Sequence, residues 1–297
     1  MYHILDLSFL GNKDTIAAFL VETSAGLVLI ESGPHSTFEV LKQAIQAKGH
    51  EIEDIKHVFL SHIHFDHAGA AWCFADLSAT IYVHPAGAKH LASPEKLYNS
   101  AKMIYGEKMQ MLWGDMNPIA ENQIYTPSHG ENITIGDTTF VAWHTPGHAV
   151  HHIAWQMGEN LFAGDVAGVK IKGGIVVPPC PPPDINVEHW LASIALMQSL
   201  NVKTLLLTHF GAVNDVQKHL EDLAKMINDW ANWMLPQYQS GKKQEEIIPL
   251  FEKYVADLLQ ENGVKEADIP KYQGANPAFM SVAGLMRYWH KRLSTNI

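Results

Sequence analysis

Apolar residues in the first two thirds of the chain fall into short runs that are typical of strands. These runs are too short for helices and are bounded by glycine, proline or polar residues. Between the second and third runs, residues 23–26 (Thr-Ser-Ala-Gly) predict a hairpin turn. The predicted strands cover residues 2–7, 16–22, 26–31, 55–60, 81–83, 133–135, 138–143, 153–155, 161–163 and 204–207.

Helical spacing of apolar residues separates these strands and then dominates the C-terminal part. Phe38, Leu41 and Ile45 are spaced as on one face of a helix, and Gly49 ends the pattern. Residues 85–120 are rich in Met, Tyr and Trp and have a helical character without clear ends. The predicted helices cover residues 37–48, 68–74, 187–200, 215–235, 242–262 and 277–293. The chain therefore predicts an α/β domain over 1–212 and a helical C-terminal region over 213–297 that packs on it.

Composition and charge restrict the partners. Hydrophobic residues make up 47% and charged residues 18% of the 297 residues, as in ordinary globular proteins. The formal net charge of -10 repels a phosphate backbone, so nucleic acid is not expected as a partner. No apolar run approaches the roughly 18 residues of a membrane span, and the N-terminus lacks the pattern of a signal peptide. We expect a cytoplasmic protein with a small-molecule substrate and no membrane partner, with a homodimer as an open alternative.

The predicted strand over 55–60 runs directly into a group of metal-ligand residues. His62, His64, Asp66 and His67 form the pattern His-x-His-x-Asp-His. In an extended segment, residues two apart point the same way, so His62 and His64 can bind one ion. Asp66 and His67 lie just beyond, where the chain turns into a helix, and can face a neighbouring ion. The pattern predicts a site for more than one metal ion.

Three later strands each deliver another potential ligand at their C-terminal end. His148 follows the strand that ends at Trp143, Asp165 follows the strand at 161–163, and His209 follows the strand at 204–207. Loops at strand ends are where a fold most readily gathers side chains from distant parts of the sequence. We therefore expect these three residues to join the first four in one site.

This series of histidines and aspartates, with these spacings, resembles the metallo-β-lactamase superfamily over about residues 1–212. The proline-rich segment, the helix from 187 and the helical end resemble the glyoxalase II-like hydrolases of that superfamily. The resemblance implies an αββα sandwich of the mixed α/β (α+β) class with a C-terminal helical extension. It assigns three residues to one ion, three to a second, and one that bridges them: His62, His64 and His148; Asp66, His67 and His209; and Asp165.

The ligand set indicates hydrolytic chemistry. Two ions with overlapping fields lower the pKa of a bridging water and so produce hydroxide near neutral pH. Asp66 is the expected catalytic residue, because it can steer the proton of that hydroxide. Two divalent ions are expected as cofactors, with Zn preferred and Fe or Mn open, since nitrogen and oxygen ligands without thiolate accept each of these metals. Relatives that cleave β-lactams often carry cysteine at the place of Asp165, which disfavours antibiotic hydrolysis.

Two further features near the predicted ligands depend on the resemblance. The superfamily usually has Asp-x-Gly near its metals, and residues 31–33 here are Glu-Ser-Gly. The departure at Ser32 weakens any supporting role inferred from that motif. His152 stands where glyoxalase II-like relatives also carry histidine, and we interpret it as support for the ligands or the core rather than as a ligand. Other histidines at strand ends, His84, His129 and His144, are interpreted as structural or surface residues.

The substrate pocket is less well defined by the sequence. Phe65 and Phe210 directly follow predicted ligands, so we expect them at the mouth of the site. The stretch 94–120, with Met103 and Tyr105, is either a pocket wall or the core of an inserted helix pair. Lys170, in the glycine-flanked segment 168–174, either reaches an anionic substrate or belongs to a solvated hairpin.

The sequence thus predicts a binuclear metal-dependent hydrolase of an ester, thioester or lactone, with phosphotriester cleavage as a promiscuous activity. The alternative is a mono-iron oxidoreductase similar to persulfide dioxygenases, which share the fold and hold iron with equivalents of His62, His148 and Asp165. A nuclease is disfavoured by the net charge of -10 and the scarcity of arginine. A non-catalytic binding module is the least favoured interpretation, because all seven ligand positions are filled.

Overall fold

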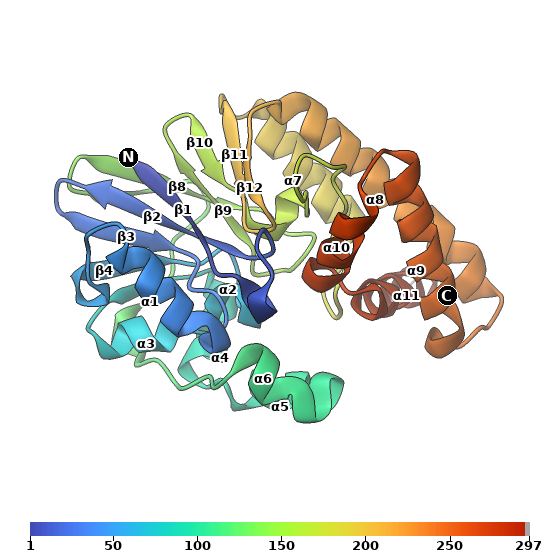
Figure 1. Cartoon of the computed structure of the whole chain (residues 1–297), viewed down its shortest axis with the longest axis horizontal. Helices are drawn as coiled ribbons and strands as arrows, with labels where there is room; N and C mark the ends of the chain where they lie inside the picture. The colour runs from blue at the N-terminus through green and yellow to red at the C-terminus, as the bar shows by residue number, and fades with distance from the viewer. Residues whose placement is uncertain (295–297) are drawn as a thin grey trace.

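The computed structural model describes residues 1–294, which form two β-sheets packed face to face between layers of helices (Figure 1). The first sheet has the order β1-β2-β3-β4-β5-β6. Its first three strands are antiparallel, and β3 to β6 are parallel. The strands are β1 (Tyr2–Asp6), β2 (Ala17–Thr23), β3 (Gly26–Ile30), β4 (Ile55–Phe59), β5 (Thr80–Tyr82) and β6 (Ile124–Tyr125).

The second sheet is built from the middle of the chain and has the order β12-β11-β10-β9-β8-β7. Its neighbouring strands are antiparallel except for β10 and β11, which run parallel with the helix α7 (Val187–Ser199) between them in the sequence. The strands are β7 (Glu131–Ile135), β8 (Thr138–His144), β9 (Ile153–Met157), β10 (Asn160–Phe162), β11 (Thr204–Leu207) and β12 (Gly211–Val213).

Alternation along the strands explains why both faces of each sheet are covered. In β2, Phe19 lies in the hydrophobic cluster between the sheets, whereas its neighbour Leu20 lies in the cluster under the helices of the outer face. In β11, Leu206 faces the other sheet and Leu205 faces the helices. Successive side chains of a strand point to opposite faces, so apolar residues at consecutive positions require cover on both sides. The αββα sandwich is thereby confirmed.

Helices over the first sheet and a short arm below it come from the N-terminal half (Figure 1). Two of them, α5 and α6, form an arm that we call the α5–α6 arm, residues 95–113. These helices are α1 (Phe38–Gln46), α2 (Phe65–Ala68), α3 (Ala71–Asp76), α4 (Pro85–Ala92), α5 (Glu95–Tyr105) and α6 (Met109–Trp113). The single helix predicted over 68–74 is wrong, because the backbone N–H of Ala70 donates to the carbonyl of Gly33 and divides it into α2 and α3.

The C-terminal helices share one hydrophobic cluster with the outer face of the second sheet. In α8, Leu220, Leu223, Ile227 and Trp230 are buried at intervals of three and four residues, and Asp215 caps the helix by accepting from the backbone N–H of Lys218. These helices are α7 (Val187–Ser199), α8 (Val216–Gln239), α9 (Gln244–Glu261), α10 (Ile269–Ala275) and α11 (Ala278–Ser294). In residues 1–294 no helix combines the length and apolar character needed to cross a bilayer.

Candidate metal centre

The turns that follow strands of both sheets bring the predicted ligands to one place. His62 and His64 lie in the segment after β4, and Asp66 and His67 lie in α2. His148 lies between β8 and β9, Asp165 in the 3-10 turn η6 (Gly164–Ala167) after β10, and His209 directly after β11. Ligand atoms of all seven side chains fall into three overlapping groups, each with its atoms within 4.8 Å of one another: His62, His64 and His148; His62, His67 and Asp165; Asp66, His67 and His209.

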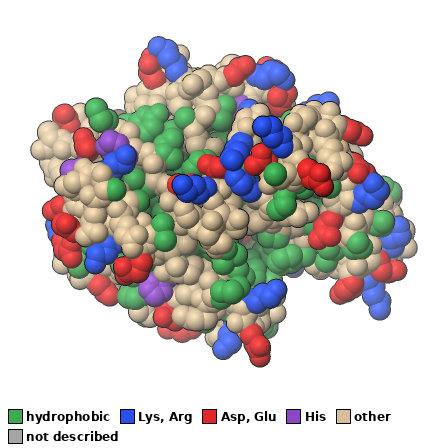
Figure 2. Space-filling model, viewed as in Figure 1, with side chains coloured by type: hydrophobic (Ala, Val, Ile, Leu, Met, Phe, Trp, Pro, Cys, Tyr) green, Lys and Arg blue, Asp and Glu red, His purple; other side chains and the backbone are tan. Residues whose placement is uncertain are grey.

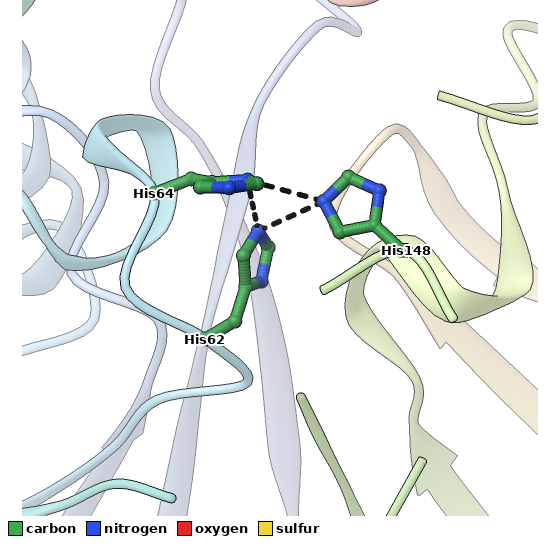
Figure 3. Close-up of side chains that lie close together, drawn as sticks. All are labelled: His62, His64 and His148. Atoms are coloured by element: carbon green, nitrogen blue, oxygen red, sulfur yellow. Dashed lines mark hydrogen bonds between the residues drawn. The ribbon is translucent and has the colours of Figure 1, made fainter. Parts of the chain in front are cut away.

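The first group is a triangle of imidazole nitrogens (Figure 3). Nε2 of His62 lies 2.8 Å from Nδ1 of His64 and 3.2 Å from Nε2 of His148, and the last two atoms are 3.1 Å apart. The three rings come from two separate loops and point toward one another. We call this triangle the first subsite.

The second group lies beside the first and combines histidine nitrogens with carboxylate oxygens. Nε2 of His209 is 3.4 Å from Oδ2 of Asp66 and 3.4 Å from Oδ1 of Asp165. Nε2 of His67 is 3.3 Å from the same Asp165 oxygen. We call Asp66, His67 and His209 the second subsite. Asp165 joins both subsites, because its other oxygen, Oδ2, lies 3.4 Å from Nε2 of His148.

Contacts on the far side of the rings determine which nitrogens have free lone pairs. Nδ1 of His148 donates to the carbonyl of Pro179 at 2.9 Å, and Nδ1 of His209 donates to the carbonyl of Thr15 at 2.7 Å. A carbonyl can only accept, so Nε2 of each neutral ring carries a lone pair that points into the site. Lone pairs of several rings and the carboxylate of Asp165 therefore converge on the same small volume.

A cation satisfies this arrangement. Nε2 of His67, Nε2 of His209 and Oδ1 of Asp165 are buried and have no hydrogen-bond partner. Such atoms are costly to bury unpaired. Ligands about 2.0–2.1 Å from a tetrahedral Zn²⁺ are separated by about 3.3 Å, close to the spacings of 2.8–3.4 Å among most of the ligand atoms. The residues present thus fit divalent metal ions.

Comparison with known proteins places this site in a family. The sequence model described as "Metallo-beta-lactamase superfamily" matches residues 11–209, which contain all the predicted ligands. The chain belongs to the metallo-beta-lactamase superfamily. Members of this superfamily are generally metal-dependent hydrolases. The structure agrees, because the superfamily motif His-x-His-x-Asp-His follows β4 after only Leu60 and Ser61, close to where the sequence predicts it.

Individual relatives of the superfamily are distant. The chain is 26% identical over 178 residues to the "Metallo-beta-lactamase fold-containing protein ST1585" of Sulfurisphaera tokodaii, covering 58% of this chain and 67% of that protein. It is 25% identical over 209 residues to the "Atrochrysone carboxyl ACP thioesterase" of Aspergillus fumigatus, covering 68% of this chain and 39% of that protein. The crystal structure of the metallo-beta-lactamase family protein TTHA1429 from Thermus thermophilus superposes with a TM-score of 0.64 at 19% identity, covering 98% of this chain and 93% of that one. The last match extends the shared fold into the C-terminal helices.

Burial and mutual proximity keep the first subsite neutral and able to bind a cation. Burial lowers the pKa of His62 well below its usual range, and the neighbouring histidines, His67 first, lower it further. Burial likewise lowers the pKa of His64 to about 3, and that of His148 in the same direction. These three rings are therefore unprotonated near neutral pH, as metal ligands must be.

In the second subsite the pKa values of the histidines are raised instead of lowered. Burial alone would depress the pKa of His67, but the carboxylates of Asp165, Asp66 and Glu31 outweigh burial and raise that pKa well above its usual range. The same balance, with Asp165 and Asp66 dominant over burial, raises the pKa of His209. A cation entering the second subsite must therefore exchange with protons, and its affinity is expected to rise with pH as protons become scarcer.

Glu31 supports the second subsite, although the altered motif around it had weakened that expectation. Its Oε1 accepts from Nδ1 of His67 at 3.1 Å, and its Oε2 accepts from the backbone N–H of Ser61 at 3.3 Å. The residue is 1% exposed, and its backbone has a positive φ of 63°. The departure at Ser32 leaves this role intact, since the Ser32 hydroxyl donates to the carbonyls of His67 and Gly33. The carboxylate at position 31 was the signal: glutamate replaces the aspartate of Asp-x-Gly, and the middle position of that motif is open to any residue.

We expect Glu31→Gln to weaken metal binding at the second subsite by about 10- to 100-fold, since outer contacts of ligating histidines typically have this effect. The amide keeps the size of the side chain but removes the negative charge that orients His67. Titration with Zn²⁺ against a competing chelator measures the change. Unaltered affinity for both ions would show that Glu31 serves only the fold.

The other histidines near the site do not join the ligand groups. Nδ1 of His152 hydrogen bonds with the hydroxyl of Thr145 at 2.8 Å, and its Nε2 faces the backbone N–H of Val166 at 3.4 Å. His152 thus contacts the turn that carries Asp165, as expected of a supporting residue. The rings of His84 and His144 pack against each other at a tilt of 52° with centroids 4.2 Å apart, and the backbone N–H of His144 donates to Nδ1 of His129.

The predicted pocket residues occupy different environments. Phe65 is 6% exposed and packs against Tyr98 and Trp113, so it forms the floor of an aromatic cluster rather than an open rim. Tyr105 contacts Trp113 in the α5–α6 arm and Phe279 in α11. The other three predicted pocket residues differ in exposure. Met103 is 83% exposed, whereas Phe210 and Lys170 are half-buried. The backbone of Lys170 forms a hydrogen bond with the backbone of His209.

Proposed function

We propose that this protein is a binuclear metal-dependent hydrolase that cleaves esters, thioesters or lactones with an apolar acyl part. The convergence of seven ligand side chains, with three buried atoms that lack any partner, carries this proposal. The shared carboxylate of Asp165 supports two adjacent ions rather than two independent ones. Zn²⁺ is the proposed metal, with Mn²⁺ or Fe²⁺ as alternatives.

Different residues of the site have different roles in such a reaction. When bound, two ions would supply an activated water and polarise the carbonyl under attack. Asp66 is the more exposed carboxylate of the site, with 21% of its side chain accessible against 5% for Asp165. Asp66 is therefore placed to accept and return a proton at its carboxylate oxygens. His67 and His209, which flank Asp66, hold its orientation.

The surroundings of the site favour an apolar acyl group. Phe65, between two ligands, begins an aromatic cluster that continues through Trp113 to Tyr105. Figure 2 shows hydrophobic side chains along the hollow between the α5–α6 arm and the C-terminal helices. On this arm Met103, Ile104 and Met111 are 83%, 48% and 57% exposed, more apolar surface than a solvated helix pair needs. The thioesterase named among the relatives is consistent with such a substrate.

A substrate panel combined with metal analysis tests the proposal. The protein would be stripped with a chelator, reconstituted with Zn²⁺, Mn²⁺ or Fe²⁺, and assayed on acyl esters, acyl thioesters, lactones, a phosphotriester and a β-lactam. We expect two ions per chain and hydrolysis that depends on them. The kcat/KM should rise roughly fourfold per added CH₂ while the acyl chain still fits the apolar hollow.

Two results would contradict the proposal. One iron per chain, with sulfite released from a persulfide and no hydrolysis, would establish the mono-iron oxidoreductase instead. A kcat/KM independent of acyl length would leave the hydrolase but remove the apolar substrate class. The charged surface, at a formal net charge of -10, gives no reason to include nucleic acids in the panel.

A further inference from the structure

His209 of the second subsite is held by two loops that come from other parts of the chain. The carbonyl of Thr15, in the loop between β1 and β2, accepts from Nδ1 of its ring at 2.7 Å. Lys170, in the loop after η6, pairs with the backbone of His209 and Phe210. The Lys170 N–H donates to the His209 carbonyl at 2.6 Å, and the N–H of Phe210 donates back to the Lys170 carbonyl at 3.4 Å. The orientation of His209 therefore depends on these two loops.

Helix α10 of the C-terminal region ties the two loops together through charge. Nζ of Lys271 lies 3.1 Å from Oδ2 of Asp14, the neighbour of Thr15. Nζ of Lys172, in the second loop, lies 3.5 Å from the same Asp14 oxygen. Both lysines also approach Oδ1 of Asp268, at 3.6 and 3.7 Å. Except for Lys172, which is half-exposed, these side chains are at most 26% exposed, so solvent screens the network less than a surface pair.

A second contact from α10 fixes the same loop by hydrogen bonds. The hydroxyl of Tyr272 donates to the carbonyl of Ile175 at 2.7 Å and accepts from the backbone N–H of Ile171 at 3.2 Å. Tyr272 is 2% exposed, and a Cβ added at Gly174 would lie 2.5 Å from its hydroxyl oxygen. The loop is thus packed directly against this side chain without room for adjustment.

The loop before β2 needs such a tether because its backbone is strained. Asp14 has a positive φ of 62°, an unfavourable region for a residue with a Cβ. Its N–H donates to Oδ2 of Asp6, and its carboxylate joins the lysines of the network. Such a conformation persists only where surrounding contacts over-determine it. If the contact with Lys271 is lost, we expect the loop to relax and the carbonyl of Thr15 to move.

We propose that α10 is a positioning element for the second metal subsite, with Lys271 and Tyr272 acting through the two loops that hold His209. This inference rests on the proposed function, since it presupposes that the second subsite binds a metal ion. It gives the C-terminal helical region a role in the chemistry that a merely packed extension would not have. Neither Lys271 nor Tyr272 belongs to the three ligand groups, so both would act through the loops.

The test compares Lys271→Met and Tyr272→Phe with wild type in the full chain. Lys253→Met is the matched control, because it removes an exposed lysine whose Nζ lies 2.7 Å from Asp257 on α9. Zn²⁺ affinities are measured by competition with a chelator, and anomalous diffraction at the zinc edge gives the occupancy of each subsite at limiting metal. Thermal unfolding of each metal-free variant records stability separately.

We expect Lys271→Met and Tyr272→Phe each to weaken the second subsite by about tenfold and the first subsite by less than about twofold. Lys271→Arg, which keeps the charge, should restore most of the affinity, and Lys253→Met should change neither subsite. Equal weakening of both subsites, or none, would overturn the inference. Wild-type protein that binds no second ion would instead overturn the proposed function.

Discussion

The double variant His62→Ala/His64→Ala is expected to lose the ion of the first subsite and to reduce kcat/KM on the best substrate by on the order of 10⁴-fold. The two rings supply two of the three nitrogens of the triangle, at 2.8 Å from each other, and His148 alone cannot replace them. The loss of a bound ion removes several kcal/mol of transition-state stabilisation. Metal content per chain and steady-state kinetics on the same sample measure both effects.

The control for this variant is His290→Ala, which removes an exposed histidine of α11. It should bind two ions and retain wild-type turnover. The double variant must also be shown to fold, because His62 is fully buried. Substantial turnover by a folded double variant would mean that catalysis does not pass through this site at all.

The ligand set could be predicted from the sequence because strand ends and ligand residues coincide. His148, Asp165 and His209 each follow a run of apolar residues, and the strands β8, β10 and β11 end within one residue of the ends of those runs. Short apolar runs bounded by turn residues are consistent with strands, and here each run is followed by a potential ligand. The sequence pattern therefore indicated which residues would meet at the strand ends. It did not give the distances between their ligand atoms.

The elements that could not be predicted from the sequence lack such a signal. Strand β12 has three residues and pairs only along β11, and β6 has two. Helix α10 begins at Ile269 with a proline next to it and carries few apolar residues, so its spacing does not separate it from a loop. Its importance comes from Lys271 and Tyr272, whose partners lie far away in the sequence. Long-range pairs of this kind cannot be read from local periodicity.

The pocket shows where the sequence was only partly informative. Phe65 and Tyr105 lie in one aromatic cluster next to the ligands, yet Phe65 is buried and Met103 projects into solvent. Residue type indicated an apolar surface near the metals. Which side chains form its floor and which its rim depends on how the α5–α6 arm sits against α11, through the contact of Tyr105 with Phe279.

The variant His209→Ala separates a two-ion hydrolase from a one-ion oxidoreductase. His62, His148 and Asp165 remain in this variant, and they are the ligands that a mono-iron site would require. We expect one ion per chain to be retained and kcat/KM for hydrolysis to fall by about 10²- to 10³-fold, because one of two clamping ions is lost. Nε2 of His209 is buried without a hydrogen-bond partner and faces two carboxylates, which is the geometry of a ligand rather than of a structural ring.

Metal content, hydrolysis and sulfite release are measured together on His209→Ala, alongside its thermal unfolding, since the carbonyl of Thr15 also loses its partner. If His209 only braced the fold, stability would fall while hydrolysis per folded molecule stayed near wild type. If a single ion carried the chemistry, activity would persist with one ion per chain. Only the two-ion hydrolase predicts a large loss of turnover in protein that is folded and still holds its first ion. Because His62, His148 and Asp165 are ligands in both mechanisms, this variant distinguishes between them.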